Sequence, residues 1–278
     1  MDIMMIKYIV SDLDGTLLDQ AGQLSEKNSS ALTKTELPVT LVSARAPQTM
    51  MPSIQQLALT GPQIAFNGGV IFKASGDFPL ILAEHPLKRR TAQQLVTALQ
   101  TEFPEISLSG YDLQNWYVQG IDDQVTAEAA LTHQSPRLIN LSQLLTNPVL
   151  KLFKLVVASD DSKRLAQINT FINDLALTDI AVQQSQTQAL EITADYATKE
   201  QALATILEAE QLTAEQVAAF GDGPNDQAML QSVAHPIAMQ NAVESVQAIS
   251  QFVTKSNVHD GVSYGIKKYI TKFNRKVG

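Results

Sequence analysis

The sequence predicts an α/β protein: a Rossmann-like parallel-sheet core with an inserted α+β domain. Short apolar, β-branched runs alternate with helix-compatible segments near both ends of the chain, which is typical of a parallel sheet. The middle of the chain instead places strands next to one another in pairs, as in an antiparallel sheet. The 278 residues, 45% of them hydrophobic, are enough for one large domain or two modest ones.

The first part of the chain contains the clearest strand signals. One apolar run stops at an acidic turn, and another is followed by a segment with a proline near its first helical turn. An Asn-Gly-Gly sequence interrupts a third apolar run and predicts a hairpin. The expected elements are strands over residues 6–10 and 39–43, helices over 25–35 and 47–59, and a hairpin within 63–72.

Residues 84–190 are predicted to form the inserted domain, and residues 1–83 and 191–278 to form the core. Trp116 and Tyr117 are expected in the interior of the inserted domain rather than at a binding surface. The elements expected there are helices over 88–101, 126–132 and 162–175, and strands over 106–111, 116–119, 150–158, 180–186 and 189–193.

After residue 194 the alternation of strands and helices returns. The expected elements are a helix over 198–209, a strand over 217–220 and a helix over 226–232. Apolar pieces around Ile237, Ala248 and Phe252 are expected to complete the sheet, and the chain ends in a basic helix.

Composition excludes several classes of function. The net charge of -8, from 20 basic and 28 acidic residues, repels nucleic acid and anionic membranes at long range. An anionic substrate therefore needs a metal ion or a well-placed Lys or Arg. The absence of cysteine excludes disulfides, thiolate metal sites and thiol catalysis, and it suits a cytoplasmic protein. We expect no signal peptide, because the N-terminus lacks a basic n-region, a long apolar h-region and a small-residue cleavage site. We also expect no membrane span, because no apolar stretch approaches the ~20 residues that a span needs.

Two acidic turns each follow a short apolar strand. Asp12 and Asp14 follow the first strand, and Asp222 and Asp226 follow a later one. Either turn alone is more simply a helix-capping turn. Together they favour a site, because ligands bind at the carboxyl edge of an open α/β sheet. Carboxylates gathered there would force one to take up a proton unless a cation bound, and oxygen ligands suit Mg²⁺.

Side chains two residues apart in an extended segment point the same way, so Asp12 and Asp14 are expected to share one pocket. Thr16 adds a hydroxyl beside them. Ser43 is placed to donate to a phosphate oxygen and Arg45 to line the entrance, although a simple loop also explains both. For Lys199, taken alone, a surface lysine is the simpler interpretation.

This order of motifs resembles the haloacid dehalogenase superfamily and, within it, the Cof-type phosphatases. The resemblance spans nearly the whole chain. Two features depart from the family pattern: Ser43-Ala44-Arg45 stands where Thr-Gly-Arg is frequent, and Glu200 stands where Gly usually follows the lysine. The motifs that carry the resemblance are DLDGTLL at 12–18, NGG at 67–69, GDGPND at 221–226, MQNA at 239–242 and DGV at 260–262.

The resemblance implies a Mg²⁺-dependent phosphatase acting on a small phosphorylated metabolite, a sugar phosphate or similar. Asp12 would attack phosphorus and form an aspartyl-phosphate. Asp14 would protonate the leaving oxygen and then activate water, and its backbone carbonyl would help to hold the metal. The inserted domain would act as a cap that closes over the substrate.

The remaining site residues follow from the same resemblance. Asp222 would be the second carboxylate ligand of the metal, and Asp226 belongs to the same metal site, where with Asn225 it orders the metal waters and the lysine. The expected phosphate-binding residues are Thr16, Ser43, Lys199 and Asn225, and Arg45 and Asn67 are expected at the substrate entrance.

Three other functions stay open on the sequence. A phosphomutase of the same superfamily would use the same aspartyl-phosphate. A phospho-accepting signalling domain combines an acid cluster, a hydroxyl and a lysine, but it lacks an acid in the position of Asp14. A relative that only binds a phosphorylated ligand is the third. The protein is expected as a monomer or small homo-oligomer.

Overall fold

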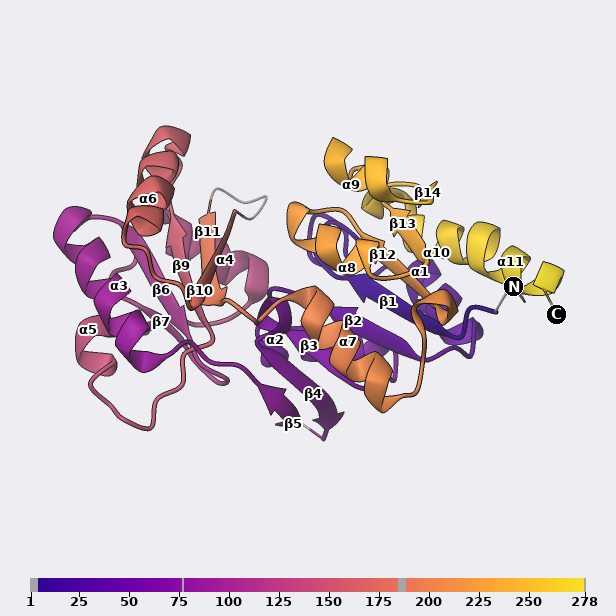
Figure 1. The fold of residues 1–278 in the computed structure, drawn as a ribbon, viewed down its shortest axis with the longest axis horizontal. Coiled ribbons are helices and arrows are strands. Elements are labelled where there is room, and N and C mark those ends of the chain that lie inside the picture. The colour runs from indigo at the N-terminus through magenta and orange to yellow at the C-terminus, as the bar shows by residue number, and fades with distance from the viewer. Residues whose placement is uncertain (1–4, 77, 185–188, 278) are drawn as a thin grey trace.

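The computed structural model describes residues 5–76, 78–184 and 189–277 and shows two lobes, each built on its own sheet (Figure 1). The larger lobe holds both ends of the described chain. The smaller lobe is a continuous insertion between β5 (Phe78–Glu84) and α7 (Lys199–Ala209). The predicted α/β architecture with an inserted second unit is confirmed.

The larger sheet has eight strands in the described chain. Its central strand β1 pairs in parallel with β2 on one side and β12 on the other, and every residue of β1 is buried. In order across the sheet the strands are β14 (Phe252–Val253), β13 (His235–Ala238), β12 (Val217–Gly221), β1 (Tyr8–Asp12), β2 (Val39–Val42), β3 (Gln63–Ala65), β4 (Val70–Ser75) and β5 (Phe78–Glu84).

The predicted hairpin around the Asn-Gly-Gly sequence is confirmed, since β3 and β4 pair antiparallel across a 3₁₀ turn, η1 (Phe66–Gly68). The expectation that a piece around Ala248 completes the sheet is wrong. Ala248 lies in a helix, α9 (Glu244–Ile249), whose buried Val246 gives it one apolar contact point rather than a strand face.

Helices and 3₁₀ turns connect the strands of the larger lobe. Helix α1 packs against α10, and α7 packs against α8. The remaining elements are α1 (Glu26–Lys34), α2 (Pro47–Gln56), α7 (Lys199–Ala209), η2 (Ala214–Gln216), η3 (Pro224–Asp226), α8 (Gln227–Gln231), α9 (Glu244–Ile249), η4 (Asn257–His259), α10 (Gly261–Gly265), the π-helix η5 (Ile266–Thr271) and α11 (Lys272–Val277).

The smaller sheet has six strands in the described chain, antiparallel except for the pair β7–β8. Helices α3, α5 and α6 lie on its far side, and α4 lies on the side of the larger lobe (Figure 1). The elements are α3 (Arg89–Glu102), β6 (Ser107–Tyr111), β7 (Trp116–Val118), α4 (Asp123–Thr132), β8 (Arg137–Leu138), α5 (Leu141–Leu144), β9 (Lys154–Ala158), α6 (Ser162–Asp174), β10 (Ile180–Gln184) and β11 (Ala189–Ala194).

Two expected strands of the insertion have different limits in the structure. The strand expected over 150–158 begins only at Lys154. The strand expected over 180–186 is described as far as Gln184, and residues 185 and 186 lie outside the described residues. Since β11 continues to Ala194, we propose that the boundary between the lobes follows this residue, rather than residue 190.

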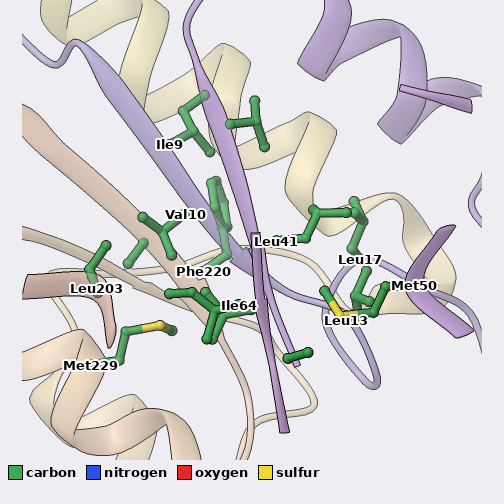
Figure 2. Close-up of a cluster of buried hydrophobic side chains, with 14 of the residues drawn as sticks. Ile9, Val10, Leu13, Leu17, Leu41, Met50, Ile64, Leu203, Phe220 and Met229 are labelled. Atoms are coloured by element: carbon green, nitrogen blue, oxygen red, sulfur yellow. The ribbon is translucent and has the colours of Figure 1, made fainter. Parts of the chain in front are cut away.

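The larger lobe has its apolar core around β1, as Figure 2 shows. Ile9 and Val10 are fully buried there, together with Leu41 of β2 and Phe220 of β12. A strand buried on both faces carries apolar side chains at consecutive positions, which explains the apolar run of Tyr8, Ile9 and Val10 that predicted β1. The smaller lobe has a separate cluster beneath α3 and α6. Within the described chain, no helix combines the length and apolar character required to cross a bilayer.

Candidate active site

Three buried carboxylates meet at the carboxyl edge of the larger sheet. Asp12 is the last residue of β1, Asp222 follows β12 directly, and Asp226 lies in η3. Because β1 and β12 are neighbouring parallel strands, their ends bring these residues to the same point. One oxygen of each carboxylate lies within 4.8 Å of the others.

Lys199, at the first turn of α7, supplies one positive charge to this cluster. Its Nζ donates to Oδ1 of Asp12 at 2.6 Å and to Oδ1 of Asp226 at 2.7 Å. Burial alone would lower the pKa of Lys199, but these two carboxylates raise it, so the ammonium stays charged. The side chain is only 2% exposed, so Lys199 is not a surface residue. The neighbouring Glu200 is exposed to solvent.

One lysine does not balance three acids. Burial raises the pKa of Asp12 well above its usual range, and the charges of Asp226 and Asp222 add to this effect against the opposing effect of Lys199. A bound cation would remove the repulsion. All the available donors are oxygens, as a hard divalent ion such as Mg²⁺ requires. The described residues therefore fit such an ion.

Three hydrogen bonds fix the orientation of the two acids that follow β12. Asp226 accepts hydrogen bonds at Oδ2 from the backbone N–H groups of Asp222 (2.9 Å) and Gly223 (3.0 Å). Asp222 accepts at Oδ1 from the hydroxyl of Thr16 at 2.7 Å. Asp226 thus has both oxygens engaged by the protein itself, and Thr16 directs its hydroxyl at an acid.

Asp14 does not join the cluster. The chain turns after β1, and the Asp14 carboxylate accepts from Nε (2.8 Å) and an Nη (2.6 Å) of Arg45. Its side chain is 49% exposed, whereas Arg45 is 12% exposed. The two acids therefore occupy different surroundings, because the segment is a turn and not the extended chain that would point both the same way.

Ser43 and the two asparagines lie around the cluster on neighbouring loops. Ser43 is buried directly after β2, and its hydroxyl accepts from the backbone N–H of Arg45 at 3.1 Å. Asn225 donates to the side-chain oxygen of Asn67 at 3.2 Å. Asn67 in turn donates to Oε2 of Glu191 at 2.9 Å, which links the two lobes.

The structure adds two residues of the smaller lobe that the sequence did not single out. Lys154 donates from Nζ to the carbonyl of Ala44 (2.9 Å) and to Oε1 of Glu191 (3.1 Å). The pair is buried, with side chains 8% and 12% exposed. The available signal was the presence of a charged residue inside each of two otherwise apolar strands, β9 and β11.

Comparison with known proteins agrees with this geometry. The family model described as haloacid dehalogenase-like hydrolase matches residues 9–266. The chain is 26% identical over 290 residues to a 5-amino-6-(5-phospho-D-ribitylamino)uracil phosphatase of Bacillus subtilis, covering 96% of this chain and 99% of that protein. It is 25% identical over 287 residues to a pyridoxal phosphate phosphatase of Escherichia coli, covering 96% and 100% respectively.

The fold is also similar to solved structures. A haloacid dehalogenase-like hydrolase from Bacteroides thetaiotaomicron superposes with a TM-score of 0.83 at 27% identity, covering 95% of this chain and 99% of that one. The likeness therefore extends over both lobes.

Proposed function

The chain belongs to the haloacid dehalogenase-like hydrolases of the Cof type and is a phosphatase, and on that premise we propose that it hydrolyses a small phosphorylated metabolite through an aspartyl-phosphate on Asp12, with Mg²⁺ as cofactor. The observation that carries the proposal is the buried group of Asp12, Asp222 and Asp226 with Lys199. The relatives act on phosphorylated small molecules by name, which favours a sugar phosphate or similar substrate.

Asp12 is the proposed nucleophile. Its Oδ1 is held by Lys199, which keeps the side chain in one orientation. The metal would be held by Asp12, Asp222 and the backbone carbonyl of Asp14, with Asp226 orienting Lys199 and the turn. When bound, Mg²⁺ supplies positive charge that neutralises the phosphoryl oxygens. Lys199 and Ser43 add donors to the same oxygens.

Asp14 is the proposed acid and base. Its exposed position at the mouth of the site suits a group that exchanges protons with the leaving oxygen and with water. In the structure Arg45 occupies both of its oxygens. A dianionic phosphate arriving at the site would compete for that guanidinium and release Asp14 for proton transfer.

The smaller lobe is the proposed cap. Asn67 and Lys154 join the lobes by hydrogen bonds at the rim of the site. Phe66 of the larger lobe also stacks on Phe153 at 5.5 Å between centroids. A closed cap excludes bulk water and so strengthens the electrostatic interactions inside.

The test is phosphate release from a panel of phosphorylated metabolites, measured with Mg²⁺ and with a chelator. We expect Asp12→Asn to lower the rate by at least about a thousandfold, because the amide cannot attack phosphorus. Asp174→Asn is the matched control, since Asp174 is an exposed acid at the end of α6.

Equal rates in the parent and in Asp12→Asn would contradict the proposal, as would release that persists in the chelator. Transfer of phosphate to a second position of the sugar, without release of inorganic phosphate, would instead indicate a phosphomutase.

A further inference from the structure

A cavity of about 170 Å³ lies on the face of the smaller sheet that carries α4. Within β9, Lys154, Val156 and Ala158 line this cavity, whereas Leu155 and Val157 pack into the cluster beneath α3 and α6. This alternation is the two-residue period of a strand. The same alternation holds in β6 and β11. The cavity is therefore lined by one whole face of the sheet and is not a gap between poorly packed side chains.

The cavity opens next to the catalytic loops. Lys154, which lines it, donates to the carbonyl of Ala44, beside Ser43. Glu191, which also lines it, accepts from Asn67. A phosphate held at Asp12 between these loops would direct its leaving group toward the cavity.

The charges around the cavity are unequal. Lys154 and Glu191 neutralise each other across 3.1 Å. Glu128, on α4, lines the same cavity, and within the described part of the chain its carboxylate accepts no hydrogen bond and forms no ion pair. Burial raises the pKa of Glu128, and Lys154 offsets part of that rise. Of the two carboxylates that line the cavity, Glu128 is thus the one without a direct partner in the described chain, and its oxygens can accept a hydrogen bond from a leaving group.

Aromatic side chains complete the wall. Tyr111 and Trp116 both line the cavity, and their rings stack at 5.9 Å with 3° between their planes. Both rings are almost fully buried, and Nζ of Lys154 lies over the Tyr111 ring at 4.8 Å from its centroid, so the pair forms a fixed floor beneath the polar side chains of the cavity. Trp116 was expected to be a core residue; it is buried, and it borders the cavity as well.

Resting on the phosphatase function proposed above, we propose that Glu128 is a specificity-determining residue whose carboxylate accepts a hydrogen bond from an ammonium or hydroxyl group of the leaving group. The enzyme then selects small phosphomonoesters with aminated or hydroxylated leaving groups. It discriminates against leaving groups that carry a carboxylate, because two like charges would meet in a half-buried cavity.

The test uses three substrates that share a six-carbon skeleton and a 6-phosphate: glucosamine 6-phosphate, glucose 6-phosphate and 6-phosphogluconate. The quantity compared is the ratio of kcat/KM for the amine to kcat/KM for the carboxylate. We expect Glu128→Gln to lower this ratio by about tenfold, as loss of a hydrogen bond to a charged group implies. Glu128→Asp keeps the charge and should keep most of the preference.

The matched control is Glu102→Gln, at the exposed end of α3, which should leave the ratio unchanged. An unchanged ratio in Glu128→Gln, or an equal loss on all three substrates, would overturn the inference. So would a parent enzyme that hydrolyses p-nitrophenyl phosphate but none of the three. A parent that releases phosphate from none of the four would instead reject the proposed function, and this inference with it.

Discussion

Gly15 shows how a single residue without a side chain shapes the site. Its φ of +81° lies in the left-handed region, and a Cβ built there would stand 2.3 Å from Oδ2 of Asp222. Asn241 also holds the Gly15 carbonyl, at 2.8 Å. The turn after β1 can approach the second acidic loop only because position 15 is glycine.

We expect Gly15→Ala to lower the free energy of unfolding by about 1–2 kcal/mol from backbone strain, and to weaken Mg²⁺ activation by displacing Asp222. Urea denaturation and the Mg²⁺ concentration for half-maximal rate measure the two effects. Gly76→Ala is the control, because Gly76 has a φ of +61° with open space around it. Gly76→Ala should lower the free energy of unfolding through backbone strain without weakening Mg²⁺ activation. Equal Mg²⁺ activation in both variants would contradict this account of Gly15.

At the scale of residues, the sequence predicted which residues form the acid cluster but not which side chains contact one another around it. Asp12, Asp222 and Asp226 follow from strand ends, which periodicity reveals. The partnership of Asp14 with Arg45 depends on how the turn at Gly15 directs a side chain. Glu191 touches Asn67 from 124 residues away, across the whole insertion. No local pattern encodes a contact of that kind.

Between elements, the buried pair of Lys154 and Glu191 is the polar link from β9 and β11 to the larger lobe. Lys154→Met leaves Glu191 buried without its cation, so we expect a loss of about 3 kcal/mol in the free energy of unfolding. The double variant Lys154→Met/Glu191→Gln should lose less than the sum of the single variants. Urea denaturation of all four proteins gives the coupling.

Lys27→Met serves as the reference for this cycle, since Lys27 pairs with Asp260 while 76% exposed. Its effect should stay below about 1 kcal/mol, as for other exposed ion pairs. Strict additivity of the Lys154 and Glu191 variants would show that the pair does not act as a unit.

The prediction of strands from the sequence succeeded where several consecutive residues are apolar. It failed where the surrounding structure decides the conformation of the segment. The strands β1, β2 and β12 were predicted from their consecutive apolar residues. The stretch 150–153 contains three apolar residues and the exposed Lys151, and it packs as irregular chain before β9 begins. The segment around Ala248 folds as α9, in which Val246 is the buried residue, and β14 forms this edge of the sheet instead.

For the molecule as a whole, the two lobes have apolar clusters of different character. The cluster beneath α3 and α6 contains only residues of the smaller lobe. The larger cluster extends across the boundary and includes Trp116 and Phe153. The larger lobe can thus keep most of its apolar core when the smaller lobe unfolds. If the larger lobe unfolded, the face of the smaller lobe that packs against it would be exposed.

We therefore expect the smaller lobe to unfold first. Trp116, the single tryptophan of the chain, is 1% exposed and reports on that lobe by fluorescence, whereas far-ultraviolet circular dichroism reports on both. Ile168→Ala, in the separate cluster, should lower the free energy of unfolding of the smaller lobe by about 3 kcal/mol and so move the midpoint of the fluorescence transition to a lower urea concentration. The late phase of the dichroism transition should stay in place. Leu41→Ala, beside β1, should move the late phase instead. If fluorescence and dichroism shift together in both variants, the residues shared across the boundary couple the lobes into one cooperative unit, and the smaller lobe is not an independent cap.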